Sequence, residues 1–362
     1  MAVDNWFEGV HDADPAEHEL LSAAAVAHLA AGVGIDGVRV LDYGQGDCSA
    51  IVDDAGEPVV FFDMGGGKQP AGSQTHPWHV EWGVDKKFAG APWRHKIPDV
   101  RHRPTVILSH WDGDHYSTAY YLTHRQMKTK VVPNDAPDVT DLKWLVPRQC
   151  RHPSKLAFVI ELNDVACWPA NVERHRFQLS ARTFVQVERC VGAIGQKYDP
   201  NLDGLALLVE RVDAGGDVVE RMLLPGDAPY AYIPSCRDGH LDKVVAMLAP
   251  HHGSKTHLDE AEESIPAASG EGRDIVYTYG LKSNGERCYE HPSAEAIEAY
   301  RKHGWERAQH PAGAFAHWPP GPDDLGDPIG RDDVLLTFSA PDPPDPAVAV
   351  RPPQRRPIAL RG

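Results

Sequence analysis

Short apolar runs bounded by glycine, proline or aspartate make up most of the hydrophobic pattern of the chain. Many contain β-branched or aromatic residues, and such runs predict strands. The turn Asp213-Ala214-Gly215-Gly216-Asp217 separates two of them and predicts a hairpin. The predicted strands are 38–43, 49–52, 58–63, 105–108, 130–133, 157–160, 177–187, 204–209, 218–224, 274–279 and 334–338.

Fewer segments have the pattern of a helix. Asp14-Pro15-Ala16-Glu17 has the composition of a helix start, and Gly32 follows the apolar stretch, so a helix is predicted over 14–31. Further helices are predicted at 116–126, 142–146, 240–248 and 293–303. Because strands and helices alternate loosely, with hairpins in both halves, we expect an α+β fold of two packed sheets with helices outside.

The pattern predicts one domain over residues 1–340. The segment 64–104 interrupts it with glycines, histidines and tryptophans, which suit either a lid over a site or a satellite hydrophobic cluster. From residue 341 to 362 prolines recur with arginines, and a disordered tail is expected.

Composition narrows the class of protein. The chain has 362 residues, 42% of them hydrophobic, and a formal net charge of −16. This charge argues against a broad nucleic-acid-binding face, although bound metal ions would still allow a small phosphodiester substrate. No signal peptide or membrane span is apparent, and the six cysteines form no C-x-x-C pair, so we expect reduced thiols and a cytoplasmic location.

The most informative motif directly follows the apolar run 105–108. Ser109-His110-Trp111-Asp112-Gly113-Asp114-His115 places four side chains that can bind a metal within six positions, at the end of a predicted strand. Imidazole and carboxylate together suit zinc, manganese or iron. A lone histidine would more often be a surface or core residue, but this density indicates a metal site.

Other polar residues also follow predicted strands. Asp63 ends one strand, where it fits a turn cap as well as a site carboxylate, and Asp227 ends another in Pro225-Gly226-Asp227. His251-His252 and His291 add imidazoles. Each is a weak signal alone, but strand ends meeting at one edge would bring them together.

These motifs resemble the metallo-β-lactamase-fold hydrolases, and most of all the hydrolase domain of ComEC-type competence proteins and its stand-alone soluble relatives. The resemblance spans about 38–338 and implies an αββα sandwich of two mixed sheets with a metal site on one edge. The matching segments are 41–47, Phe62-Asp63, 109–115, Asn201, 224–227, 250–254 and His291-Pro292.

The resemblance also implies roles. His110 and Asp112 would hold one of two divalent ions, zinc or alternatively manganese. Asp114, His115 and one of His251 or His252 would hold the other, with Asp227 between them. Asp114, Asp63 and His291 are the expected catalytic residues, His291 as a proton donor. Residues expected to orient the ligands from behind are Asp42, Asp47, Asp63, Ser254 and Asn284.

The chain departs from the commonest form of the family's motif, His-x-His-x-Asp-His, because Asp112 holds the second position, as in the ComEC-like branch. A further histidine expected before Asp227 has only His152 and His175 as candidates. We therefore expect a weaker first metal site or one completed by water.

The expected activity is hydrolysis of phosphodiesters by a metal-bound hydroxide, as a nuclease or nucleotide phosphodiesterase. The alternatives are a hydrolase of small esters, lactones or lactams, and a metal-stabilised effector that acts only with a protein partner. No membrane partner is expected.

Overall fold

The computed structural model describes most of the two sheets and the loops at one edge of them. The described residues are 12–13, 21–30, 32–41, 46–65, 103–121, 139–149, 158–191, 199–239, 241–256, 258, 262–270, 274–278, 291–305, 307–309 and 334–339. Most of the predicted segment 64–104 and all of 341–362 lie outside them, as do the predicted strand 130–133, Asp42, Asn284 and His152.

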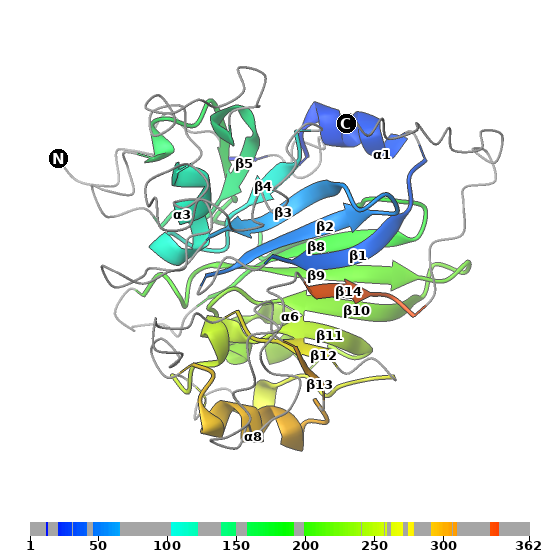
Figure 1. Cartoon of the computed structure of the whole chain (residues 1–362), viewed down its shortest axis with the longest axis vertical. Coiled ribbons are helices and arrows are strands. Elements are labelled where there is room, and N and C mark those ends of the chain that lie inside the picture. The colour runs from blue at the N-terminus through cyan, green and yellow to red at the C-terminus, as the bar shows by residue number, and fades with distance from the viewer. Residues whose placement is uncertain are drawn as a thin grey trace, which may run out of the picture.

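Two mixed seven-stranded sheets form the centre of the fold (Figure 1). The first has the order β14-β1-β2-β3-β4-β5-β6 and the second β13-β12-β11-β10-β9-β8-β7. The first comprises β1 (Ile35–Val40), β2 (Cys48–Asp53), β3 (Pro58–Met64), β4 (Thr105–Ile107), β5 (Lys143–Val146), β6 (Asp164–Cys167) and β14 (Val334–Thr337). The second comprises β7 (Arg174–Gln178), β8 (Thr183–Arg189), β9 (Leu205–Val212), β10 (Val218–Leu224), β11 (Val244–Leu248), β12 (Asp274–Val276) and β13 (Arg307–Gln309).

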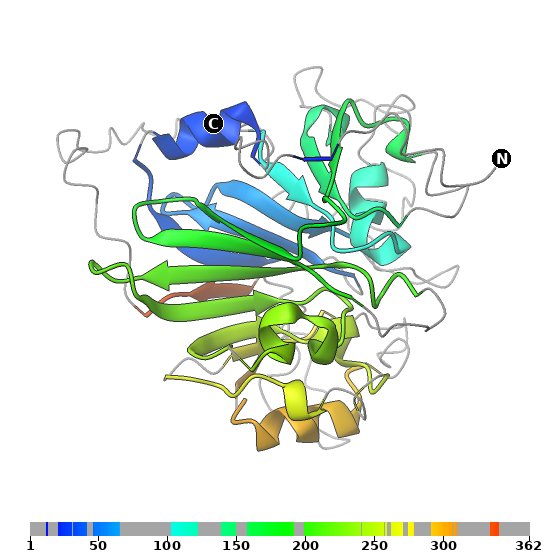
Figure 2. The same cartoon turned by 180° about the vertical axis from the view of Figure 1, so that it is seen from behind.

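The two sheets are stacked on one another, because Figure 2 shows the long strands of the second sheet in front of those of the first.

Helices lie outside the sheets. In Figure 1, α3 lies beside the first sheet and α8 beyond β11–β13. The helices are α1 (Ala23–Ala30), α3 (Gly113–Tyr121), α6 (Pro234–Arg237) and α8 (Ala294–Lys302), with short 3-10 turns η5 (Val139–Asp141), η6 (Tyr230–Tyr232), η7 (Pro250–Gly253) and η8 (Glu262–Ser264). The expected α+β sandwich of two mixed sheets is therefore confirmed.

The buried apolar side chains form three layers. The central one lies between the sheets and includes Val38, Phe62, Leu207 and Leu224. A second includes Trp144 of the first sheet and a third Tyr300 of α8. Burial of this apolar surface holds helix and sheet layers together. No described helix is long and apolar enough to cross a membrane.

Four predicted elements are wrong. The single strand predicted over 177–187 is instead the end of β7 and most of β8, two antiparallel strands separated by residues 179–182. Segments 142–146 and 240–248, predicted as helices, contain the strands β5 and β11 instead, and the described part of 157–160, predicted as a strand, begins a helical turn at Phe158. Every residue of β11 is buried, and a fully buried strand lacks the apolar–polar alternation that separates strand from helix. The first helix begins at Ala23, after the described non-helical Leu21 and Ser22, because the Ser22 hydroxyl caps the Ala25 amide at 3.0 Å.

The strand directions place the polar motifs at one edge. In the first sheet β3, β4 and β5 run parallel, so Asp63 near the end of β3 lies beside the segment that follows β4. In the second sheet β10, β11 and β12 run parallel, and Asp227, His251-His252 and Thr278 follow their ends. Carboxyl ends of parallel strands meet at the same edge of a sheet.

Candidate metal centre

The motif after β4 is a loop that enters a helix. Ser109 and His110 lie in the loop, and Asp114 and His115 lie in the first turn of α3. The amide of Leu205, at the start of β9, donates to the Ser109 carbonyl at 2.7 Å. This bond ties the loop of the first sheet to the second sheet.

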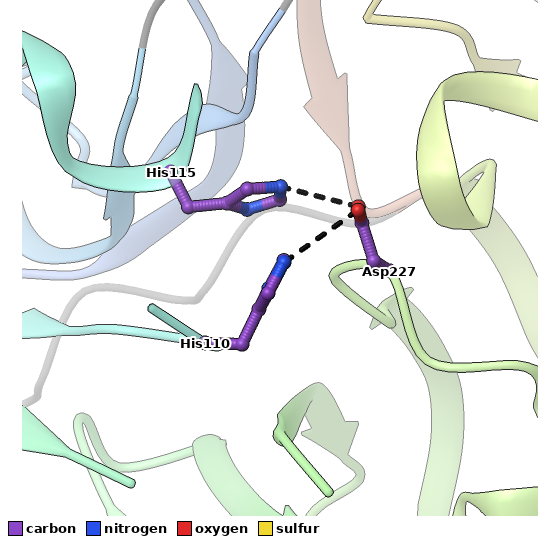
Figure 3. Close-up of side chains that lie close together, drawn as sticks. All are labelled: His110, His115 and Asp227. Atoms are coloured by element: carbon purple, nitrogen blue, oxygen red, sulfur yellow. Dashed lines mark ion pairs between the residues drawn. The ribbon is translucent and has the colours of Figure 1, made fainter. Parts of the chain in front are cut away.

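Among the described residues, His110, His115 and Asp227 form one group of possible ligands (Figure 3). His115 Nε2 lies 3.2 Å from Asp227 Oδ1, and His110 Nε2 lies 3.6 Å from Asp227 Oδ2. The two imidazole centroids are 4.0 Å apart, and all three residues are buried. The structure thus unites two residues after β4 with one after β10, as the sequence predicts.

Ser109 and Asp63 stand behind these imidazoles and fix their orientation. The Ser109 hydroxyl donates to Asp63 Oδ2 at 2.7 Å, and its amide donates to Asp63 Oδ1 at 2.6 Å. Because the hydroxyl has only one proton, its oxygen accepts from His110 Nδ1, 3.0 Å away. His115 Nδ1 lies 2.8 Å from Asp63 Oδ2. Both histidines therefore present Nε2 lone pairs toward Asp227 when they are neutral.

A second group consists of Asp114, His115 and His252. His252 Nε2 lies 3.4 Å from Asp114 Oδ2. His252 reaches this position from η7, where His251 and His252 have φ of 49° and 56°. Non-glycine residues rarely adopt this left-handed backbone, and consecutive ones need support from the surrounding structure.

His251 lies on the more open side of Asp227. Its Nε2 is 3.9 Å from Asp227 Oδ2, and its side chain is 28% exposed, compared with 1% for His252. His291 belongs to the same group of imidazoles, with its ring centroid 5.8 Å from that of His251 and 6.4 Å from that of His252. Of the two neighbouring histidines, the geometry therefore makes His252 the buried ligand candidate.

The remaining predicted residues take different positions. Asp47 lies behind His252, with its Oδ1 3.6 Å from His252 Nδ1. Ser254 is buried beyond η7 and donates to Thr256 rather than to a ligand candidate. Asp112 directly precedes α3, and its carbonyl accepts from the His115 amide at 3.0 Å. His175 lies on β7, the outermost strand of the second sheet, and belongs to none of the described ligand groups.

Burial and mutual contact shift the pKa values at this edge. Burial, together with the charge of His115, lowers the pKa of His110 to about 4. Burial also lowers the pKa of His252, but contacts with Asp114 and Asp47 outweigh it and raise the value to about 10. For His115, the carboxylates of Asp227 and Asp63 likewise outweigh burial and raise the pKa. Burial raises the pKa of Asp63 to about 6, against the opposing effect of His115.

The donor set fits divalent metal ions. His110 Nε2, His115 Nε2, His252 Nε2 and Asp227 Oδ1 are buried atoms that make no hydrogen bond. Buried polar atoms normally have partners, and these three imidazole nitrogens and one carboxylate oxygen are arranged as ligands would be. Imidazole nitrogen with carboxylate oxygen is a donor set that zinc and manganese accept.

Two contributors were not among the residues expected in the site. Ser109 is part of the motif, and its position between strand and ligands is the signal that could have found it. Thr278 follows β12 and contacts both His252 Nδ1, at 3.0 Å, and Asp47. Nothing near Thr278 in the sequence marks it, because its partners lie 26 and 231 residues away.

No protein-family model matches the chain, and no curated protein matches it. Among solved structures, unliganded yeast PDE1 is similar with a TM-score of 0.41 and 9% identity, over 76% of this chain and 97% of that one. The metallo-β-lactamase-fold protein YhfI from Bacillus subtilis is similar with a TM-score of 0.37 and 10% identity, over 76% and 96%. Likenesses this distant do not bear on activity, and the fold class rests on the two sheets themselves.

Proposed function

We propose that this protein is a metal-dependent hydrolase whose centre lies between His110, His115, His252 and Asp227. The observation that carries the proposal is that His110 Nε2, His115 Nε2, His252 Nε2 and Asp227 Oδ1 are buried without a hydrogen bond and belong to two groups of possible ligands that share His115. A purely structural polar cluster would satisfy these atoms internally.

The residues divide into two ligand sets. His110, Asp112 and Asp227 would hold one ion, and Asp114, His115, His252 and Asp227 the other. Two bound ions would supply a nucleophilic hydroxide near neutral pH and stabilise negative charge on the attacked group. Asp63 is fully buried against Ser109 and His115, so its part is to orient and polarise these side chains.

The imidazoles that are more exposed than His252 would donate the proton to the leaving oxygen. His251 has the exposure needed to meet a substrate, and His291 lies next to it. A donor must be within hydrogen-bonding reach of the oxygen that leaves. We assign this part to His291, with His251 holding the substrate or sharing the proton.

The proposed substrates are phosphodiesters, because non-bridging phosphate oxygens suit a clamp of two metal ions. A net charge of −16 repels long polyanions. We therefore place small nucleotides ahead of extended DNA or RNA.

The test compares three substrates with zinc or manganese present: bis(p-nitrophenyl) phosphate, p-nitrophenyl acetate and a simple lactone. Asp114→Ala removes a ligand, and Asp213→Ala removes a carboxylate from the exposed β9–β10 turn as a matched control. We expect phosphodiester turnover by wild type and Asp213→Ala, and a loss of at least about 100-fold in Asp114→Ala.

Other outcomes contradict the proposal in distinct ways. Turnover of the ester or lactone alone would make the protein a small-molecule hydrolase. Bound metal without turnover of any of the three substrates would favour a metal-stabilised interaction subunit.

A further inference from the structure

Thr278 links the two sheets behind His252. It follows β12 and is 2% exposed, and its hydroxyl donates to Asp47 Oδ1, in the loop just before β2 of the other sheet. The same hydroxyl oxygen lies 3.0 Å from His252 Nδ1. Thr278 also accepts a long hydrogen bond of 3.4 Å at its carbonyl from the Gly46 amide.

The hydroxyl has one proton, which determines the direction of its bonds. An ionised Asp47 can only accept, so the proton of Thr278 is committed to the carboxylate. The oxygen then accepts from a proton on His252 Nδ1. His252 Nε2 is left facing Asp114 with no hydrogen bond of its own.

Thr278 gives the Asp47 carboxylate a hydrogen-bonded connection to His252. The direct separation between Asp47 Oδ1 and His252 Nδ1 is 3.6 Å, which is beyond hydrogen-bonding distance. Thr278 lies within hydrogen-bonding distance of both. The arrangement resembles that behind His110, where the hydroxyl of Ser109 lies between His110 Nδ1 and the Asp63 carboxylate.

The need for this support follows from the turn that contains His252. His252 has a left-handed φ of 56°, so its backbone does not belong to a regular helix or strand that would position the imidazole ring. Gly253 fixes the backbone, because a Cβ there would lie 2.7 Å from both Pro292 and Tyr277. That contact does not set the rotation of the ring, whereas the bond to Thr278 does.

We propose that Thr278 is a positioning residue, which relays the Asp47 carboxylate to His252 and so presents His252 Nε2 as a ligand. The role in metal binding rests on the proposed function; the hydrogen-bond relay itself does not. Groups behind metal-binding histidines typically contribute about 10- to 100-fold to metal affinity.

The test uses Thr278→Val, which keeps the shape of the side chain and removes the hydroxyl, and Thr278→Ser, which restores the hydroxyl. Thr183→Val is the control, because Thr183 is also buried but lies at the far end of β8, opposite Arg211. Zinc affinity is measured by competition with a chromophoric chelator. The Nδ1 proton of His252 is followed by NMR in metal-free protein.

We expect Thr278→Val to weaken zinc binding about 10- to 100-fold and to lose the slowly exchanging Nδ1 proton. Thr278→Ser should restore both, and Thr183→Val should change neither while losing similar thermal stability. Equal zinc affinity in wild type and Thr278→Val, or failure of serine to rescue, would overturn the role in metal binding. An Nδ1 proton that exchanges as slowly in Thr278→Val as in wild type would overturn the relay, even in a wild type that bound no zinc.

Discussion

The protonation of each histidine decides whether it can serve as a ligand. His110 is held neutral by burial and by the neighbouring His115, with its Nδ1 proton directed to Ser109. His115 and His252 lie against carboxylates that raise their pKa, so without metal they retain protons that binding must displace. Asp63 influences both His110 and His115, since it accepts a hydrogen bond from Ser109, which contacts His110, and itself contacts His115.

Replacing Asp63 with Asn should therefore disturb both ligands and stability. An amide NH₂ would face the Ser109 donors or His115 Nδ1, and we expect a loss of about 3 kcal/mol in the free energy of unfolding. Metal affinity should fall about 10- to 100-fold. Chemical denaturation and metal titration provide the measurements.

Asp53→Asn is the matched control for this substitution. Asp53 is a buried carboxylate at the last position of β2, where one oxygen accepts from the Ala55 and Glu57 amides. An asparagine oxygen can keep those bonds, so the loss should be about 1 kcal/mol with metal affinity unchanged. Equal effects of the two substitutions on metal affinity would contradict the role given to Asp63.

At the scale of elements, close backbone contacts set the spacing of the ligands. Gly65, just past β3, packs so tightly on the start of α3 that an added Cβ would lie 1.7 Å from the Asp114 carbonyl. It would also lie 2.7 Å from the Asp47 carbonyl. One glycine thus lets β3, the Asp47 loop and α3 meet behind the centre.

Gly65→Ala should push α3 away from β3 and displace Asp114 and His115. We expect destabilisation by about 3 kcal/mol and loss of metal binding, because overpacking against backbone cannot be relieved by a rotamer change. Gly215→Ala, in the exposed β9–β10 turn, has only the Asp213 side chain at 3.2 Å and should cost less than about 0.5 kcal/mol. Thermal denaturation with metal titration checks both, and unchanged metal binding in Gly65→Ala would refute the described packing.

The sequence predicts helices and strands correctly where turn or capping residues mark their ends. The hairpin around Asp213–Asp217 and the helix capped by Ser293 follow from local residues, and both are confirmed. The strands β5 and β11 were mistaken for helices because their apolar residues run continuously, as in any segment buried on both faces. The choice between His251 and His252 depends on a left-handed turn that no local pattern reveals.

For the whole molecule, sandwich formation brings together candidate ligands separated by more than a hundred residues. The sequence predicts which strand ends supply them, because the direction of parallel strands is a general rule. It does not predict Thr278, whose partners come from both sheets. The acidic groups drawn together at this edge are also what makes metal-free protein sensitive to pH.

Metal-free protein should lose stability as pH rises from about 6.5 to about 10. The pKa of His252 is raised from 6.5 to about 10 in the folded state, so its contribution is complete below 6.5 and lost as the folded protein deprotonates. Burial raises the pKa of the Cys190 thiol as well, which acts in the same direction above pH 9. Denaturation of metal-free protein at several pH values between 6.5 and 10 measures how the free energy of unfolding changes with pH. A free energy of unfolding that rises with pH would contradict this prediction.

We propose that the edge around Asp227 is a metal centre that performs hydrolysis. The most direct measurement is stepwise titration of metal-free protein with zinc or manganese, following bound metal and bis(p-nitrophenyl) phosphate turnover in the same samples. We expect that turnover appears only as metal binds, and that Asp227→Asn lowers both. Turnover independent of bound metal, or full metal binding without turnover, would contradict it.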